Sequence, residues 1–176
     1  MGRSGGPPFS LGWDVSMLPR QDNVEIQATV HFKNHENLIY VTAPVGGLGI
    51  ASRSNATVRL YSAHDLPAPF WSRAGKQTGC TIDLDIDPDE IERAELHMVI
   101  WDGGRGTAEN PVTLNGHGLA VAGEGKHDVL YRKLPIDPRL LRRTGNRIEV
   151  LSDTEHHGIE VLLPGPALMI RSRAGR

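Results

Sequence analysis

The chain has 176 residues, of which 39% are hydrophobic and 23% charged, a composition typical of a globular domain with a substantial core. Its 19 basic and 21 acidic residues give a formal net charge of −2, so charge offers no reason to expect nucleic acid or an anionic membrane as a partner. No apolar run approaches the roughly 18 residues that span a bilayer, and the single cysteine, Cys80, excludes an internal disulfide. The 20 glycines and 12 prolines favour many short strands over a helical bundle.

The two ends of the chain are polar and irregular. Residues 1–8 are rich in glycine and proline and lack the apolar stretch of a signal peptide. The chain is therefore either a cytoplasmic protein or a module of a longer secreted protein, with residues 1–8 and 172–176 as flexible ends. We favour the second interpretation, which implies an extracellular or periplasmic location, and we expect one domain over residues 1–176.

Alternation of apolar and polar residues is the main pattern, and it covers residues 24–32, 80–86, 94–101 and 147–150. Further strands are expected at residues 38–42, 57–62, 112–114, 117–121, 128–134, 159–163 and 167–172. No segment keeps a 3.6-residue period over three turns, so no long helix is expected. Strands with one apolar and one polar face build sandwiches of antiparallel sheets. The predicted fold is therefore an all-β antiparallel sandwich with short helical turns.

Three turns have clear sequence signals. Asp87 and Asp137 each precede a proline, so each aspartate can cap a short helical turn whose first position tolerates proline. Asn115 and Gly116 lie between two short apolar strands, and this pair favours a type I′ hairpin because both of its central positions need positive φ. We interpret Asn115 as a structural residue and not as a ligand contact.

The order of these features resembles the galactose-binding-domain-like β-sandwich, a jelly roll found in carbohydrate-binding modules and in accessory domains of glycoside hydrolases and polysaccharide lyases. The likeness rests on the strand at 94–102, the hairpin at 112–116, the leucine-containing turn at 136–141 and the segment 145–150. It covers roughly half of the chain, so residues 1–75 are expected to supply the remaining strands. The resemblance implies sugar binding, and such sandwiches often carry a structural Ca²⁺.

The connections between strands divide into two groups if consecutive strands run alternately up and down. Both Asp-Pro turns and the Asn115-Gly116 turn then lie at one end. The longer loops, at residues 63–77, 102–110, 122–126 and 153–158, gather at the other end. Loops clustered on a rigid sandwich are common positions for binding residues.

Sugar binding needs an aromatic ring for the C–H face of a pyranose and charged groups for its hydroxyls. We expect Trp101 and one of Phe70 or Trp71 to stack on the sugar. The expected polar contacts are Asp102, Arg105, Glu109, Asp153, His156 and His157. Competing interpretations remain open: Trp101 is a packing residue, Phe70 and Trp71 close the end of the sandwich, or the aspartates only stabilise strand ends.

Metal binding has weak support from the sequence. Asp83, Asp85, Asp87 and Asp89 alternate as a solvated strand face would, so calcium stays an alternative without assigned ligands. The adjacent His156 and His157 point to opposite sides of an extended chain, and no metal-binding spacing of the HExxH or paired-cysteine type occurs. No other cofactor is expected.

The function that we expect from the sequence is non-catalytic binding of a poly- or oligosaccharide, with a catalytic domain in the same parent chain as a further partner. A glycosidase or a lyase is the alternative, in which Asp102, Glu109, Asp153 or His157 would act as acid, base or nucleophile. A structural β-domain that braces a catalytic neighbour is a third possibility. No nucleophile elbow, P-loop or dinucleotide fingerprint is present.

Overall fold

The computed structural model describes residues 4–51, 56–72, 76–104, 112–119, 121, 128–150 and 157–173, and only the backbone of residues 72, 102–104, 157 and 158. Contacts divide the chain into two compact units, Met1–Ala56 and Thr57–Arg176, which are described separately. The expectation of one domain over the whole chain stays a prediction. Across the described ranges, no helix has the length and apolar character to cross a bilayer.

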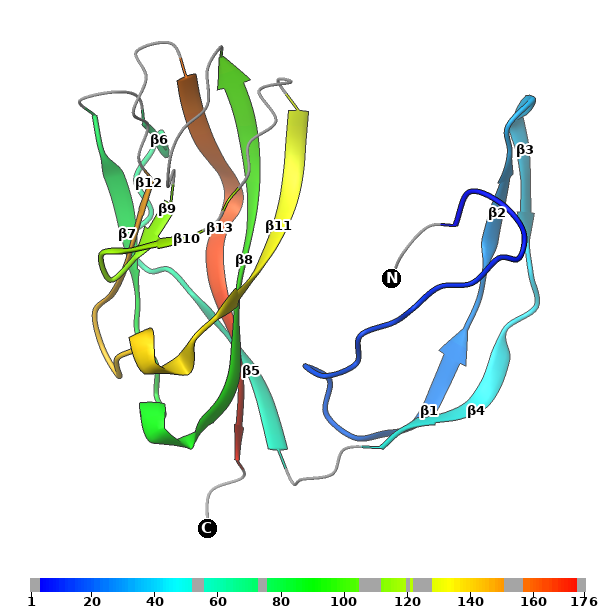
Figure 1. Ribbon diagram of the computed structural model, residues 1–176, viewed down its shortest axis with the longest axis horizontal. Helices are drawn as coiled ribbons and strands as arrows, with labels where there is room; N and C mark the ends of the chain where they lie inside the picture. Colours follow the sequence, from blue (N-terminus) through cyan, green and yellow to red (C-terminus); the bar gives the residue numbers. More distant parts are fainter. Residues whose placement is uncertain are drawn as a thin grey trace. The chain divides into compact units, whose positions relative to one another are not determined.

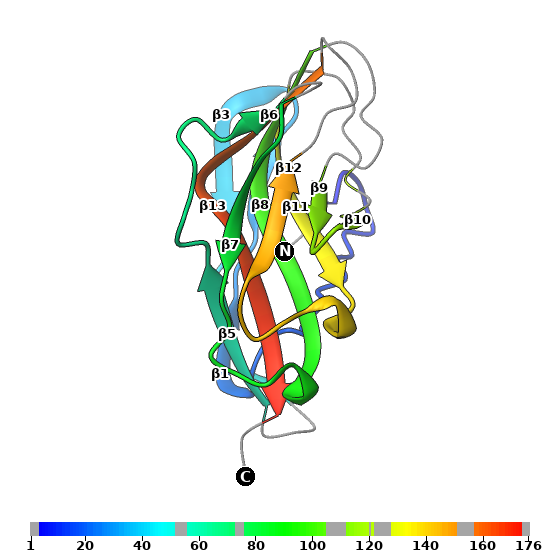
Figure 2. The same cartoon turned by 90° about the vertical axis from the view of Figure 1, so that its left-hand side faces the viewer.

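The second unit is an antiparallel β-sandwich (Figures 1 and 2). In one layer β8 and β13 are central, and β6 pairs with β13 beside the main path of the sheet. This layer contains β11 (Asp128–Ile136), β8 (Ile91–Gly104), β13 (His157–Arg173), β5 (Ala56–Ser62) and β6 (Trp71–Ser72). The other layer contains, in spatial order, β10 (His117–Leu119), β9 (Val112–Leu114), β12 (Asn146–Val150) and β7 (Thr78–Ile82). The predicted all-β antiparallel sandwich is confirmed.

The core lies between these two layers and is built by the predicted alternation. On β8, Leu96, Met98 and Ile100 are at most 2% exposed, while the intervening residues are only partly buried. On β12, Ile148 and Val150 are fully buried and face the same core cluster. Period-two alternation therefore assigns the inner and outer faces of these strands correctly.

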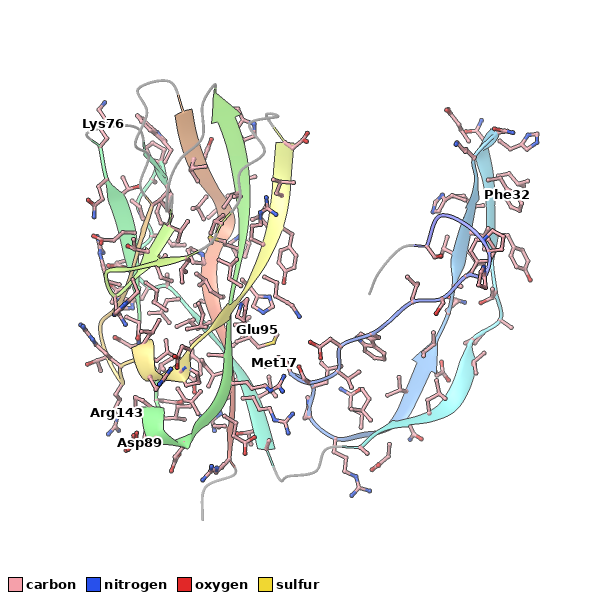
Figure 3. The ribbon with its side chains drawn as sticks, viewed as in Figure 1. Met17, Phe32, Lys76, Asp89, Glu95 and Arg143 are labelled. Atoms are coloured by element: carbon pink, nitrogen blue, oxygen red, sulfur yellow. The ribbon has the colours of Figure 1, made fainter. Side chains whose placement is uncertain are left out.

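The predicted turns form and gather at one end of the sandwich. Asp87 caps η1 (Pro88–Glu90) and Asp137 caps η2 (Pro138–Leu140), each accepting a backbone N–H two residues on at 3.0 Å. Asn115 has φ 52° and Gly116 has φ 83°, as a type I′ turn requires. The Asn115 side chain donates to the Leu140 carbonyl at 2.7 Å, which places this hairpin beside η2. Figure 3 shows Asp89 and Arg143 at this end and Lys76 at the opposite end, so the predicted grouping of the turns is confirmed.

A buried asparagine joins these turns to the sheet. Asn146 is fully buried, and its Oδ1 accepts from the Arg142 N–H at 2.8 Å and from Asn115 Nδ2 at 3.2 Å. Its Nδ2 donates to the Ile82 carbonyl at 3.1 Å and to the Arg142 carbonyl at 2.6 Å. All the hydrogen-bonding capacity of the amide is used, which is what makes a polar group tolerable in a core. The segment 145–150 thus has a structural role in fixing η2 and the hairpin against β7 and β12.

β13 joins two strands that the sequence separates. The predicted strands at 159–163 and 167–172 are one strand of 17 residues, with an irregularity between Leu162 and Ala167. This irregularity accommodates the Pro164-Gly165-Pro166 segment, in which Gly165 has φ 91°, a value that favours glycine. The strand continues to Arg173, and Ser172 is buried with its hydroxyl 3.0 Å from that of Thr57. Ordered structure therefore reaches into the end that was expected to be flexible.

The first unit consists of two-stranded sheets. One pairs β1 (Gln21–Ile26) with β4 (Val45–Ile50), and the other pairs β2 (Thr29–Phe32) with β3 (His35–Val41). The single strand predicted over residues 24–32 is wrong, because it is interrupted at Gln27 and Ala28, and β1 and β2 pair with different strands. There Ala28 N–H donates to Thr42 Oγ1 at 3.1 Å, and Gln27 Nε2 donates to the Thr42 carbonyl at 3.0 Å. Among the described residues of the range 1–75, the strands that join the sandwich sheets are β5 and β6.

Candidate functional site

Two tryptophans and a glutamate form one row across the five-stranded sheet. Glu160 of β13 pairs with Trp101 of β8 on one side and with Trp71 of β6 on the other. Its neighbours Ile159 and Val161 are 0% and 6% exposed and belong to the core, so Glu160 is on the outer face. Directly paired residues project from the same face of a sheet. The register therefore places the carboxylate between the two indoles, which are two strand spacings, about 10 Å, apart.

Phe70 and Trp71 occupy opposite faces of the sheet. Phe70 is 6% exposed within the core, and its carbonyl accepts the Val161 N–H at 2.8 Å. The Trp71 carbonyl accepts the Thr78 hydroxyl at 3.0 Å, so β6 is anchored on both sides. The Lys76 ammonium lies 5.4 Å from the Trp71 ring centroid, a distance suited to a cation–π contact. Phe70 fits the interpretation of a residue that closes the sandwich, whereas Trp71 stands in the row of Glu160.

The other predicted site residues are near this row or outside the described ranges. The backbone of Asp102 pairs with Asp128 and Ile159, and that of His157 pairs with Gly104, one to three residues from the tryptophan row. The side chains of Asp102 and His157 are not described. Arg105, Glu109, Asp153 and His156 lie outside the described residues. Their assignment as ligand contacts stays a prediction.

A hydrogen-bonded series of polar side chains lies farther along the same face of the sheet. The Tyr131 hydroxyl hydrogen-bonds to His97 Nδ1, and His97 Nε2 is 3.1 Å from Glu95 Oε2. Lys133 Nζ is 3.2 Å from Glu95 Oε1. Figure 3 shows Glu95 on β8, and the register pairs Lys133 with His97 and Tyr131 with Val99. The outer face of the sheet therefore offers aromatic rings beside partnered polar groups.

Sequence reasoning missed Glu160 and the group formed by Glu95, His97, Tyr131 and Lys133. Alternation over 94–101 already put Glu95 and His97 on the polar face of their strand. The same alternation around Glu160, between Ile159 and Val161, was an available signal. What the sequence could not provide is the register, which decides that these residues are neighbours.

The acidic stretch after β7 is engaged in contacts within the sandwich. Asp85 accepts from the Tyr61 hydroxyl and from Arg59 Nη1, the latter at 2.7 Å; the hydrogen bond from Tyr61 and then the charge of Arg59 lower the pKa of its carboxyl group. Asp83 accepts the Gly145 N–H at 2.7 Å. In the part of the chain that the structure describes, no three His, Cys, Asp or Glu side chains are grouped as metal ligands. Calcium binding stays a prediction.

The fold is similar to part of a known enzyme. The chain resembles a β-porphyranase of glycoside hydrolase family 86 from the human gut bacterium Bacteroides plebeius, with a TM-score of 0.54 and 15% identity. The match covers 92% of this chain and 31% of that one, so the chain spans about a third of the enzyme's length. This likeness establishes the fold.

Two further matches involve another family 86 enzyme, in wild-type and substituted form, each in complex with neoagarooctaose. Their TM-scores are 0.49, with 11% and 12% identity, and they cover 87% of this chain and 28% of theirs. No protein-family model matches the sequence, and no curated protein matches it.

Proposed function

We propose that this chain is a non-catalytic carbohydrate-binding sandwich of the galactose-binding-domain-like kind, within a larger carbohydrate-active enzyme. Its ligand is a poly- or oligosaccharide that lies on the outer face of the five-stranded sheet. The observation that carries the proposal is the row in which Glu160 stands between Trp71 and Trp101. The fold shared with about a third of a β-porphyranase supports the enzyme context.

The chemistry of this row suits a sugar. Each indole offers a flat apolar surface to the C–H face of a pyranose. A carboxylate between them can accept hydrogen bonds from neighbouring hydroxyls, and bonds to a charged acceptor are stronger than neutral ones. Of the polar residues predicted from sequence, Asp102 and His157 have described backbones, which lie one to three residues from this row.

A glycosidase is less well supported by the described part of this face. Two carboxylates must lie about 5–10 Å apart across the scissile bond. Glu160 and Glu95, which share this face, are six residues apart along the strands, because Glu160 pairs with Trp101. That separation is about 20 Å, so these two groups cannot act on one bond.

The test compares tryptophan variants. Trp71→Ala and Trp101→Ala should each weaken binding by about 1–3 kcal/mol, measured by calorimetry with neoagarooctaose and then a panel of other oligosaccharides. Trp13→Ala, which removes a partly exposed tryptophan of the first unit, is the matched control and should bind like the parent. Reducing-end release from the same sugars should be absent.

Two results would contradict the proposal. Equal binding by the parent and both tryptophan variants would show that the sugar does not contact this row. Release of reducing ends by the parent protein, abolished in a Glu160→Gln variant, would show that the chain is an enzyme.

A further inference from the structure

The hydrogen-bonded series of polar side chains on the outer face begins with Tyr131, close to the tryptophan row. Tyr131 is in the row of Val99, two residues along β8 from Trp101. This places Tyr131 about 7 Å from the tryptophan row in the strand direction. A sugar chain seated on Trp101 and running along β8 would reach Tyr131 next.

The hydrogen-bond partners of His97 determine which of its two ring nitrogens carries the hydrogen. Glu95 faces the ammonium of Lys133 at 3.2 Å, so its carboxylate acts as an acceptor, and His97 Nε2 donates to it at 3.1 Å. In the neutral imidazole the other nitrogen, Nδ1, carries no hydrogen and accepts. The Tyr131 hydroxyl must then donate to Nδ1. The hydroxyl hydrogen of Tyr131 is then used in the bond to His97, so the phenolic oxygen can only accept a hydrogen bond from a ligand.

Both ends of this series of polar side chains are exposed, Tyr131 more than Lys133, whose side chain is 45% exposed. Tyr131 is 63% exposed, whereas the side chains of Glu95 and His97 are 12% and 13% exposed. The rings of His97 and Tyr131 are in contact, with centroids 5.8 Å apart and an interplanar angle of 53°. The partly buried side chains of Glu95 and His97 thus orient Tyr131 but do not contact the ligand themselves.

We propose that Tyr131 forms a second sugar subsite that requires a free hydroxyl on the bound saccharide. The ligand hydroxyl donates to the Tyr131 oxygen, and His97 is a positioning residue that holds the tyrosine proton away. This inference rests on the proposed function. The subsite accepts an oligosaccharide that extends along β8 and rejects one in which the contacting hydroxyl is capped as a methyl ether.

The experiment uses the full chain and the oligosaccharide panel, beginning with neoagarooctaose. Tyr131→Phe keeps the ring and should bind about 5- to 10-fold more weakly near neutral pH, the loss of one hydrogen bond. His97→Ala removes the acceptor for the Tyr131 hydroxyl and should weaken binding about as much as Tyr131→Phe, whereas His97→Asn retains an acceptor near the Nδ1 position and should bind like the parent. Tyr40→Phe, at an exposed tyrosine of the first unit, is the control and should leave binding unchanged.

The outcomes separate this inference from the proposed function. If Trp101→Ala weakens binding while Tyr131→Phe binds like the parent, the function stands and the second subsite is refuted. Equal binding by His97→Ala and His97→Asn overturns the role of His97. If the parent binds no oligosaccharide of the panel, both proposals fail.

Discussion

The buried amide of Asn146 gives a quantitative test of how the sandwich is held together. Replacing Asn146 with alanine removes four hydrogen bonds, at 2.6, 2.8, 3.1 and 3.2 Å. A net value of about 1 kcal/mol for each bond predicts a loss of about 3–5 kcal/mol in the free energy of unfolding. Asn146→Asp should cost more, because a carboxylate would face the carbonyl oxygens of Ile82 and Arg142 in place of a donor.

Urea unfolding followed by tryptophan fluorescence measures this loss. A Trp13→Phe background restricts the signal to Trp71 and Trp101, which both belong to the sandwich, so that the first unit does not contribute. Arg143→Ala is the control, since this exposed side chain is in the same turn and its backbone carbonyl keeps the bond from Leu84 N–H at 2.8 Å. The control should remain within about 0.5 kcal/mol of the parent. A similarly small change in Asn146→Ala would refute the role assigned to this residue.

Two further predictions concern titratable groups. Cys80 is fully buried, and burial raises the pKa of its thiol to about 12. Ellman's reagent should therefore label this thiol only when urea unfolds the sandwich, at the rate of unfolding. Stoichiometric labelling of the folded protein would contradict this prediction. Hydrogen bonds from the Arg139 side chain and then its backbone N–H lower the pKa of Asp137 to about 2. Since that pKa lies below the unfolded value of about 3.9, the stabilisation is present above about pH 4 and is lost as the pH falls towards 2. Arg139→Ala should move the Asp137 midpoint, followed by carbon NMR, up towards the ordinary value, and an unmoved midpoint would show that Arg139 is not the cause.

Much of the sandwich could be predicted because its signals are local. The caps at Asp87 and Asp137 and the type I′ turn at Asn115 each depend on a few adjacent residues. Alternation along β8 is also local, since it requires only that one face of the strand be buried. These features together predict antiparallel layers and the end at which the turns gather.

The first unit shows where such reasoning fails. Alternation over residues 24–32 predicts one half-buried strand, but only Val24 is buried among its apolar residues, and Val30 and Phe32 are 38% and 42% exposed. A period-two pattern does not reveal which sheet a strand joins. β4 was missed because its three glycines, in the sequence Val-Gly-Gly-Leu-Gly-Ile, hide the alternation.

Part of the candidate site could be predicted from the sequence. Trp101 and one of Phe70 or Trp71 could be proposed as stacking residues from their type and from the grouping of the loops. Glu160 could not be placed between them, because cross-strand register depends on contacts between residues far apart in the chain. For the same reason, the link from Tyr131 through His97 to Glu95 appears only once β8 and β11 are aligned.

The position of β13 in the middle of its sheet affects how the protein must fold. β13 lies between β8 and β5, and the contact between Thr57 and Ser172 joins residues 115 positions apart. Such high contact order slows folding, because distant segments must meet before their contacts can stabilise anything. Until residues 157–173 have left the ribosome, β8 and β5 present bare backbone edges that invite pairing with neighbouring chains. Pairing of β13 with β8 and β5 therefore covers edges that would otherwise favour aggregation of the partly folded chain.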